Sequence, residues 1–175
     1  RWRPTDRVAL VTHELDLATA HDFGNALLLG ALLGIEREKR NVREGFGIAG
    51  LRSFVMFAMV GAIGGHLAHT LQAPWVLVAA IVAVAAIVVA GYLAAAKVRP
   101  GELGLTTELA ALVTCLLGAL STSGHRELAI ALGVGAAALL AYKKPLHDLV
   151  GRLGWDDVLV GLRLLLALFL VLPLL

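Results

Sequence analysis

The feature that most constrains this sequence is a run of 44 consecutive residues, 53–96, without Asp, Glu, Lys or Arg. A membrane-spanning helix needs about 20 apolar residues, so a run of this length holds two spans. Pro74 lies between them and suits the first turn of the second helix. Only 16% of the residues are charged, against about 25% in ordinary soluble domains, and the mean hydropathy is +0.84. These values predict an integral membrane protein.

The remaining apolar segments predict an all-α fold, a polytopic bundle of about five to six transmembrane helices. The predicted spans are 23–35, 51–71, 74–96, 106–120, 128–142 and 158–175. The first of these is short for a full crossing and needs residues from upstream. Upstream, apolar residues of the segment 1–22 fall on one stripe. This pattern indicates an amphipathic helix on the membrane surface or, as an alternative, a plain helical lead-in to the first span.

These segments suggest three parts of the chain. A periplasmic, amphipathic lead-in takes residues 1–22, and a five-helix membrane domain takes residues 23–157. The start of a sixth helix, 158–175, is expected to lead into a further C-terminal part.

The distribution of basic residues predicts the orientation in the membrane. Ten Lys and Arg residues lie in the segments 36–52, 97–102 and 143–157, whereas four lie on the other side, at Arg1, Arg3, Arg7 and Arg126. Basic loops stay in the cytoplasm, so these three segments are expected there and the N-terminus outside.

Several function classes are not expected. The net charge of +2 does not indicate nucleic-acid binding, because the basic residues cluster in short loops between apolar runs. The sequence has no phosphate-binding loop, nucleophile elbow or H-E-x-x-H motif, so we expect neither an enzyme nor a bound cofactor. Cys115 is the only cysteine, which excludes an intrachain disulfide.

Ionisable residues near the span ends are the candidate functional groups, because a charge at bilayer depth costs about 2.5 to 3.5 kcal/mol on insertion scales. Glu36 and Arg37 end the first span, and Arg52 begins the second. Arg52 could pair with Glu36 across a short hairpin. The alternative is a solvated boundary that only sets the orientation.

Thr106, Thr107 and Glu108 form a second candidate group, at the start of the fourth span. Two hydroxyls and a carboxylate can coordinate a hard cation through oxygen. The alternative is a carboxylate that the helix dipole favours at this position. The topology predicts that this group and the residues Glu36, Arg37 and Arg52 meet in the cytoplasmic half.

Other pairs at helical spacing are open to two interpretations. Asp22 and Asn25 could hold an ion or cap the first span, and His66 and His69 could bind a metal or lie at the membrane interface. Two G-x-x-x-G pairs predict close helix packing. Their members are Gly30, Gly34, Gly61 and Gly65.

Residues 27–40 read LLLGALLGIEREKR, and GLRS follows at 50–53. A Gly-rich helix that ends in G-hydrophobic-E-R-E, followed by a G-L-R-[ST] turn, resembles the signature of the MgtC/SapB membrane protein family. The later stretches GLTTELAALVTCLLGAL and YKKPLHDLVGRL resemble the longer branch of that family, in which a second membrane domain of unknown function follows. The matching residues of the signature are Gly34, Ile35, Glu36, Arg37, Glu38, Gly50, Leu51, Arg52 and Ser53.

The resemblance implies a multi-pass protein of the bacterial inner membrane that is linked to magnesium. It favours a transporter or ion-homeostasis protein with a polar site between helices in the cytoplasmic half. The alternative is a non-transporting regulator that binds another membrane complex. Either function places the chain in a lipid bilayer, as a homo-oligomer or beside another membrane protein, with no nucleic-acid partner.

Overall fold

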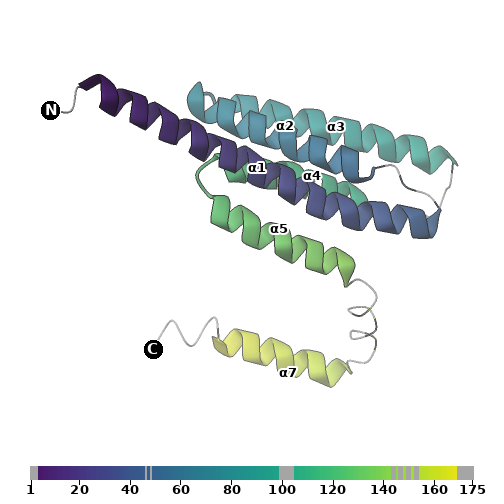
Figure 1. The fold of residues 1–175 in the computed structure, drawn as a ribbon. Coiled ribbons are helices and arrows are strands. Elements are labelled where there is room, and N and C mark those ends of the chain that lie inside the picture. The colour runs from purple at the N-terminus through teal and green to yellow at the C-terminus, as the bar shows by residue number, and fades with distance from the viewer. Residues whose placement is uncertain are drawn as a thin grey trace. The chain divides into compact units, whose positions relative to one another are not determined.

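A computed structural model of the chain describes residues 4–45, 47, 49–98, 105–142, 145, 148, 151 and 154–168. All regular structure in these ranges is helical, which confirms the all-α prediction there (Figure 1). The helices are α1 (Pro4–Glu44), α2 (Leu51–Thr70), α3 (Trp75–Val98), α4 (Thr106–Thr122), α5 (Arg126–Ala141) and α7 (Trp155–Leu166). Some predicted features lie outside the described residues: Arg1, Arg3, Arg99, Lys143, Lys144, Arg152 and the end of the sixth span, 169–175.

Helix α1 is 41 residues long and runs without a break through the predicted boundary at residue 22. At 1.5 Å per residue it extends for about 60 Å, roughly twice the thickness of the bilayer hydrocarbon. The lead-in and the first span are therefore one helix, which is the second of the two arrangements considered for residues 1–22. The upstream part of α1 thus continues the predicted first span, 23–35, as helix.

The chain divides into two compact units, residues 1–138 and 139–175. In the first unit, α2 packs against α1, α3 and α4, and α4 also contacts α1 and α3. Small, branched and aromatic apolar side chains form the buried core of these contacts. They include Ala26, Leu29 and Leu33 of α1, Phe54, Ala58 and Ala62 of α2, and Ala110, Ala111 and Cys115 of α4.

Glycines allow the helices of the first unit to approach closely. A Cβ added at Gly30 would lie 2.8 Å from that of Ala58, and one at Gly34 would lie 2.8 Å from the Cα of Leu51. Gly61 faces the backbone of α4 in the same way. The first G-x-x-x-G pair therefore lies against α2, and the second, in α2, lies against α4.

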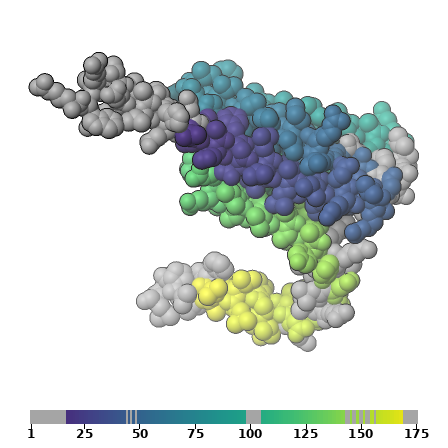
Figure 2. All heavy atoms as spheres, in the orientation of Figure 1, coloured from purple at the N-terminus to yellow at the C-terminus, as the bar shows by residue number. Residues whose placement is uncertain are grey.

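Helix α5 continues this unit on the side of α1, where Figure 2 shows the two helices side by side. Ala129 is buried, and the side chain of Leu29 fills the space above Gly133. Small residues on α5 thus let a large residue of α1 pack onto it.

Helices α2 and α3 are long and apolar enough to cross a membrane, α3 over Trp75–Lys97. Helix α4 is apolar but shorter, at 17 residues. Helices α5 and α7 have 16 and 12 residues, fewer than the about 20 that a span needs. By length and composition, the described helices thus support two membrane spans directly.

The second unit contains α7. Asp157 caps its start by accepting a hydrogen bond from the backbone N–H of Gly154, at 3.0 Å. Arg163, in the last turn, is exposed and suits the negative end of the helix dipole.

Candidate functional site

A buried ion pair lies in the second half of α1. The side chain of Arg37 is 1% exposed, and its Nε donates to Oε2 of Glu36 at 2.5 Å. Nη1 of Arg37 donates a longer hydrogen bond, 3.4 Å, to the hydroxyl of Thr107 in the first turn of α4. The pair therefore connects α1 with the start of α4.

One polar cluster contains Glu36, Arg37, Thr107 and Glu108. Two polar atoms of this cluster are buried without a hydrogen-bond partner. They are Nη2 of Arg37 and Oε2 of Glu108, which follows Thr107 in α4. An unpaired buried group costs about 1 to 3 kcal/mol, and more when it is charged, so nearly all such groups in folded proteins find a partner. A ligand or water molecule beside Glu108 would satisfy this carboxylate.

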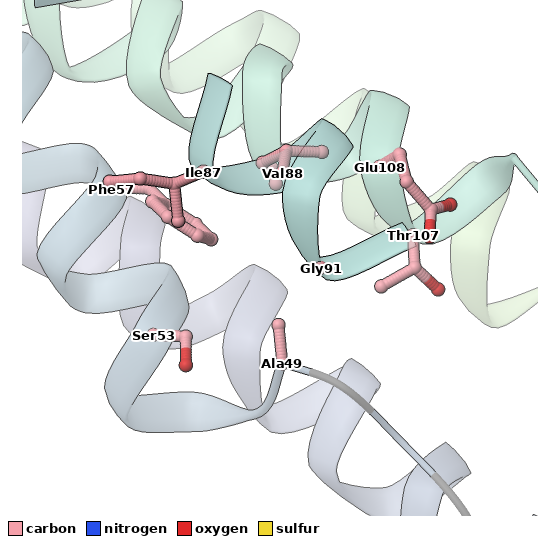
Figure 3. A pocket seen from close by; sticks show the side chains of 9 residues that line it. Ala49, Ser53, Phe57, Ile87, Val88, Gly91, Thr107 and Glu108 are labelled. Carbon is pink, nitrogen blue, oxygen red and sulfur yellow. The ribbon is translucent and has the colours of Figure 1, made fainter. Parts of the chain in front are cut away.

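Glu108 lines a cavity of about 180 Å³ between α2, α3 and α4 (Figure 3). Its walls are mostly apolar, and the carboxylate of Glu108 and the hydroxyls of Ser53 and Thr107 are the polar side-chain groups. The lining residues are Ala49, Ser53, Phe57, Ile87, Val88, Gly91, Thr107, Glu108 and Ala111. A cavity of this volume has room for several water molecules or a small ligand.

The connection between α1 and α2 is held by α1. Oε2 of Glu38 accepts a hydrogen bond from the backbone N–H of Leu51 at 3.1 Å, and Nδ2 of Asn41 donates to the carbonyl oxygen of Ala49 at 2.9 Å. These bonds hold Ala49 and the start of α2, which carries Ser53, beside the cavity. The sequence pattern alone indicated no role for the side chains of Glu38 and Asn41. The signal for Glu38 was its place in the E-R-E segment.

The structure brings together four of the six predicted residues, Glu36, Arg37, Thr107 and Glu108, but leaves out Thr106 and Arg52, which are both exposed. The expected pairing of Arg52 with Glu36 was wrong, because Glu36 pairs with its neighbour Arg37.

Helical geometry explains this correction. Phe54 is buried and its Cβ lies beside Gly34, so this face of α2 meets α1. Arg52 is two residues earlier, about 200° around the helix, and therefore projects away from α1.

Comparison with protein-family models matches residues 23–149, nearly three quarters of the chain, to the MgtC family. The chain belongs to the MgtC family. Members of this family are membrane proteins, which agrees with the two apolar helices α2 and α3. No curated protein and no solved structure gives a match. All four residues of the cluster lie within the part that matches the MgtC family.

The other predicted polar pair of this MgtC-family chain lies elsewhere. Oδ1 of Asp22 is 3.6 Å from Nη1 of Arg126 at the start of α5. Capping, one of the two interpretations of Asp22, was wrong, because α1 continues through this residue. Asp22 is 14 residues from Glu36 on the same helix, about 21 Å away, so it and the half-buried Asn25 do not join the cluster.

The two histidines of α2 do not form a metal site among the described residues. The ring of His66 packs against Phe23 with 5.6 Å between the ring centroids, and His69 is exposed. The described side chains include no group of three or more His, Cys, Asp or Glu residues that could hold a metal ion.

Proposed function

We propose that this protein is a multi-pass protein of the bacterial inner membrane that transports a cation, or maintains ion homeostasis, through the cavity at Glu108. The MgtC family suggests a link with magnesium homeostasis. Helices α1 to α4 pack around one core, and short connections require successive helices to reverse direction. In this arrangement all four helices cross the bilayer, and α1 does so by means of its extra length.

We also propose that the cavity lies in the cytoplasmic half of the bundle. The basic residues at this end of the bundle belong to the end of α1 and the last turn of α3, where Arg43 and Lys97 lie. The cavity lies at the same end, because Ser53 opens α2 and Glu108 opens α4. Basic residues favour the cytoplasmic side, so the cavity faces that side.

The observation that carries the proposal is the buried, unpartnered oxygen of Glu108 on the cavity wall. A carboxylate without a partner at membrane depth is costly unless it holds a proton or binds a cation. No Lys, Arg or His side chain of the described residues forms an ion pair with it. A bound cation would supply the missing positive charge.

Charge movement in proteoliposomes tests this function. The purified full-length protein is adsorbed on a solid-supported membrane, and currents are recorded after concentration jumps of MgCl₂, KCl and butylammonium chloride. We expect a current with at least one of these cations and its loss in Glu108→Gln. Glu127→Gln is the matched control, because Glu127 occupies the first turn of α5 as Glu108 does that of α4. Silence of the parent protein with all three salts would overturn the proposal.

A second candidate function is a non-transporting regulator that binds another membrane complex. The outer face of α3 favours this candidate, since α3 is far less buried than α2 and exposes large apolar side chains such as Val78, Val82 and Leu93. Crosslinking in native membranes from cysteines introduced on this face would test it. Recovery of the protein alone or with its own copies, together with cation currents, would exclude this alternative.

A further inference from the structure

We infer that the cavity at Glu108 takes a monovalent organic ammonium ion, an amine on a short apolar body, and not a divalent metal ion. This inference rests on the proposed cation site and names its ligand class. It depends on three observations: the net charge of the cluster, the composition of the cavity walls and the exposure of α3.

The charges of the cluster leave room for one positive charge. Glu36 and Arg37 form a contact ion pair and neutralise one another. Glu108 is the remaining charged residue, and one of its oxygens is buried without a partner. A monovalent cation would balance it. A divalent ion would leave one positive charge in excess, close to the buried guanidinium of Arg37, and an unbalanced buried charge is strongly unfavourable.

The donor atoms of the cavity also fit an ammonium group better than Mg²⁺. Mg²⁺ requires six oxygen ligands in near-octahedral geometry and gives up its water molecules reluctantly. The lining side chains offer one carboxylate and two hydroxyls, and the hydroxyl of Thr107 already accepts a hydrogen bond from Arg37. A primary ammonium has three N–H donors, which the carboxylate of Glu108 and the hydroxyl of Ser53 can accept.

The rest of the cavity suits an apolar body. Figure 3 shows Thr107 and Glu108 on one side of the cavity and Phe57 and Ile87 on the other. The aliphatic walls cannot form hydrogen bonds with the water shell of a metal ion, but they gain about 25 cal/mol for each Å² of apolar ligand surface that they bury. Phe57 adds an aromatic ring to this apolar side, against which the apolar body of the ligand can pack.

The apolar wall reaches the outside of the bundle on α3. Ile87 lines the cavity and is nevertheless 63% exposed. In the proposed membrane arrangement this opening faces lipid. An ammonium ligand could therefore come from a free amine or from the amine headgroup of a phospholipid, and the experiment separates these two sources.

The test is the thermal unfolding of the purified full-length protein in detergent with butylammonium chloride, MgCl₂ or KCl at equal ionic strength. We expect butylammonium to raise the melting temperature saturably, by about 4 °C at tenfold its dissociation constant. Glu108→Gln should abolish this rise and Glu127→Gln should preserve it. The melting temperature in KCl corrects the values in butylammonium chloride and in MgCl₂ for the effect of ionic strength.

The outcomes separate this inference from the proposed function. A Glu108-dependent rise with MgCl₂ and none with butylammonium would overturn the ammonium ligand and leave the cation site standing. No rise with any salt would also overturn the inference, while the proteoliposome currents decide the proposed function independently. In nanodiscs, a butylammonium response that phosphatidylethanolamine suppresses would identify a lipid headgroup as the natural source. A response equal in phosphatidylcholine and phosphatidylethanolamine would identify a free amine.

Discussion

The carboxylate of Glu38 accepts a hydrogen bond from the backbone N–H of Leu51, with 3.1 Å between Oε2 and N. A side chain of α1 thus caps the start of α2. Gly50 at the start of α2 has no side chain to form such a bond, and a Cβ there would occupy the position of Oε2 of Glu38. Glu38 therefore supplies the cap that Gly50 lacks, and Gly50 leaves the space that the carboxylate needs.

This relationship predicts non-additive stability changes. Glu38→Ala should lower the free energy of unfolding by about 1 kcal/mol, the usual value of a helix cap. Gly50→Ala should destabilise by at least as much, because the new methyl group displaces the carboxylate. The double variant should lose at least about 0.5 kcal/mol less than the sum, since no carboxylate is then left to displace. Reversible unfolding in mixed micelles measures all three, and strictly additive losses would contradict the coupling.

The close approach of α2 and α4 gives a second prediction. A side chain at Gly61 would collide with the backbone carbonyl of Cys115, and backbone cannot rotate out of the way as a side chain can. Gly61→Ala should therefore destabilise by about 1 to 3 kcal/mol, the cost of overpacking. Gly135 in α5 has no atom within 4 Å of an added Cβ, so Gly135→Ala is the matched control.

The same unfolding assay measures both glycine variants. Gly135→Ala should be neutral or stabilising by up to about 1 kcal/mol, because alanine favours a helix. Equal stability of the two variants would show that α2 and α4 are further apart than the structure indicates.

The apolar pattern predicted the helices wherever a loop separates them. The second span was expected at 51–71 and α2 covers Leu51–Thr70, and the fourth was expected at 106–120 and α4 covers Thr106–Thr122. The limits of α1 were not predictable in this way. Asp22 and Glu36 lie at the two ends of an apolar run, but α1 continues through both of them. Carboxylate side chains are compatible with a helical backbone, so the limit of an apolar run is not the limit of a helix.

The candidate site was predictable in its location and less so in its contacts. Alternating helix directions brought the end of the first span and the start of the fourth to one end of the bundle, which located Arg37 and Glu108 together. Arg52 points away because of how α2 is rotated about its own axis. This rotation depends on which face of α2 meets α1. The cavity walls, such as Ile87, carry no distinctive signal in an apolar run, so the apolar half of the site required the structure.

The buried ion pair gives a third prediction. Arg37→Ala should lower the free energy of unfolding by about 3 kcal/mol, because it leaves the carboxylate of Glu36 largely buried without its partner. Arg37→Lys keeps the charge but cannot reproduce both contacts of the guanidinium, so a smaller loss of about 1 kcal/mol is expected. Thermal and denaturant unfolding measure these losses.

Arg43→Ala is the control for the ion pair, since Arg43 is an exposed residue in the last turn of the same helix. Its effect should stay within about 0.5 kcal/mol. If Arg37→Ala proved as harmless as Arg43→Ala, Arg37 would be accessible to water and the closed cluster that it forms with Thr107 would not exist in the membrane.

The final prediction concerns the membrane crossing itself. Thr70 and Arg43 are exposed residues near opposite ends of the bundle, Thr70 at the end of α2 and Arg43 just before α2 begins. With Cys115 replaced by alanine, cysteines introduced singly as Thr70→Cys and Arg43→Cys report on the two sides of the membrane. A membrane-impermeant maleimide added to intact spheroplasts should label Thr70→Cys, and should label Arg43→Cys only after permeabilisation, because the basic end faces the cytoplasm. The reverse pattern would invert the orientation and move the Glu108 cavity to the outer half. Labelling of both variants from outside would show that α2 does not cross, and a cation path through the bundle would then be impossible.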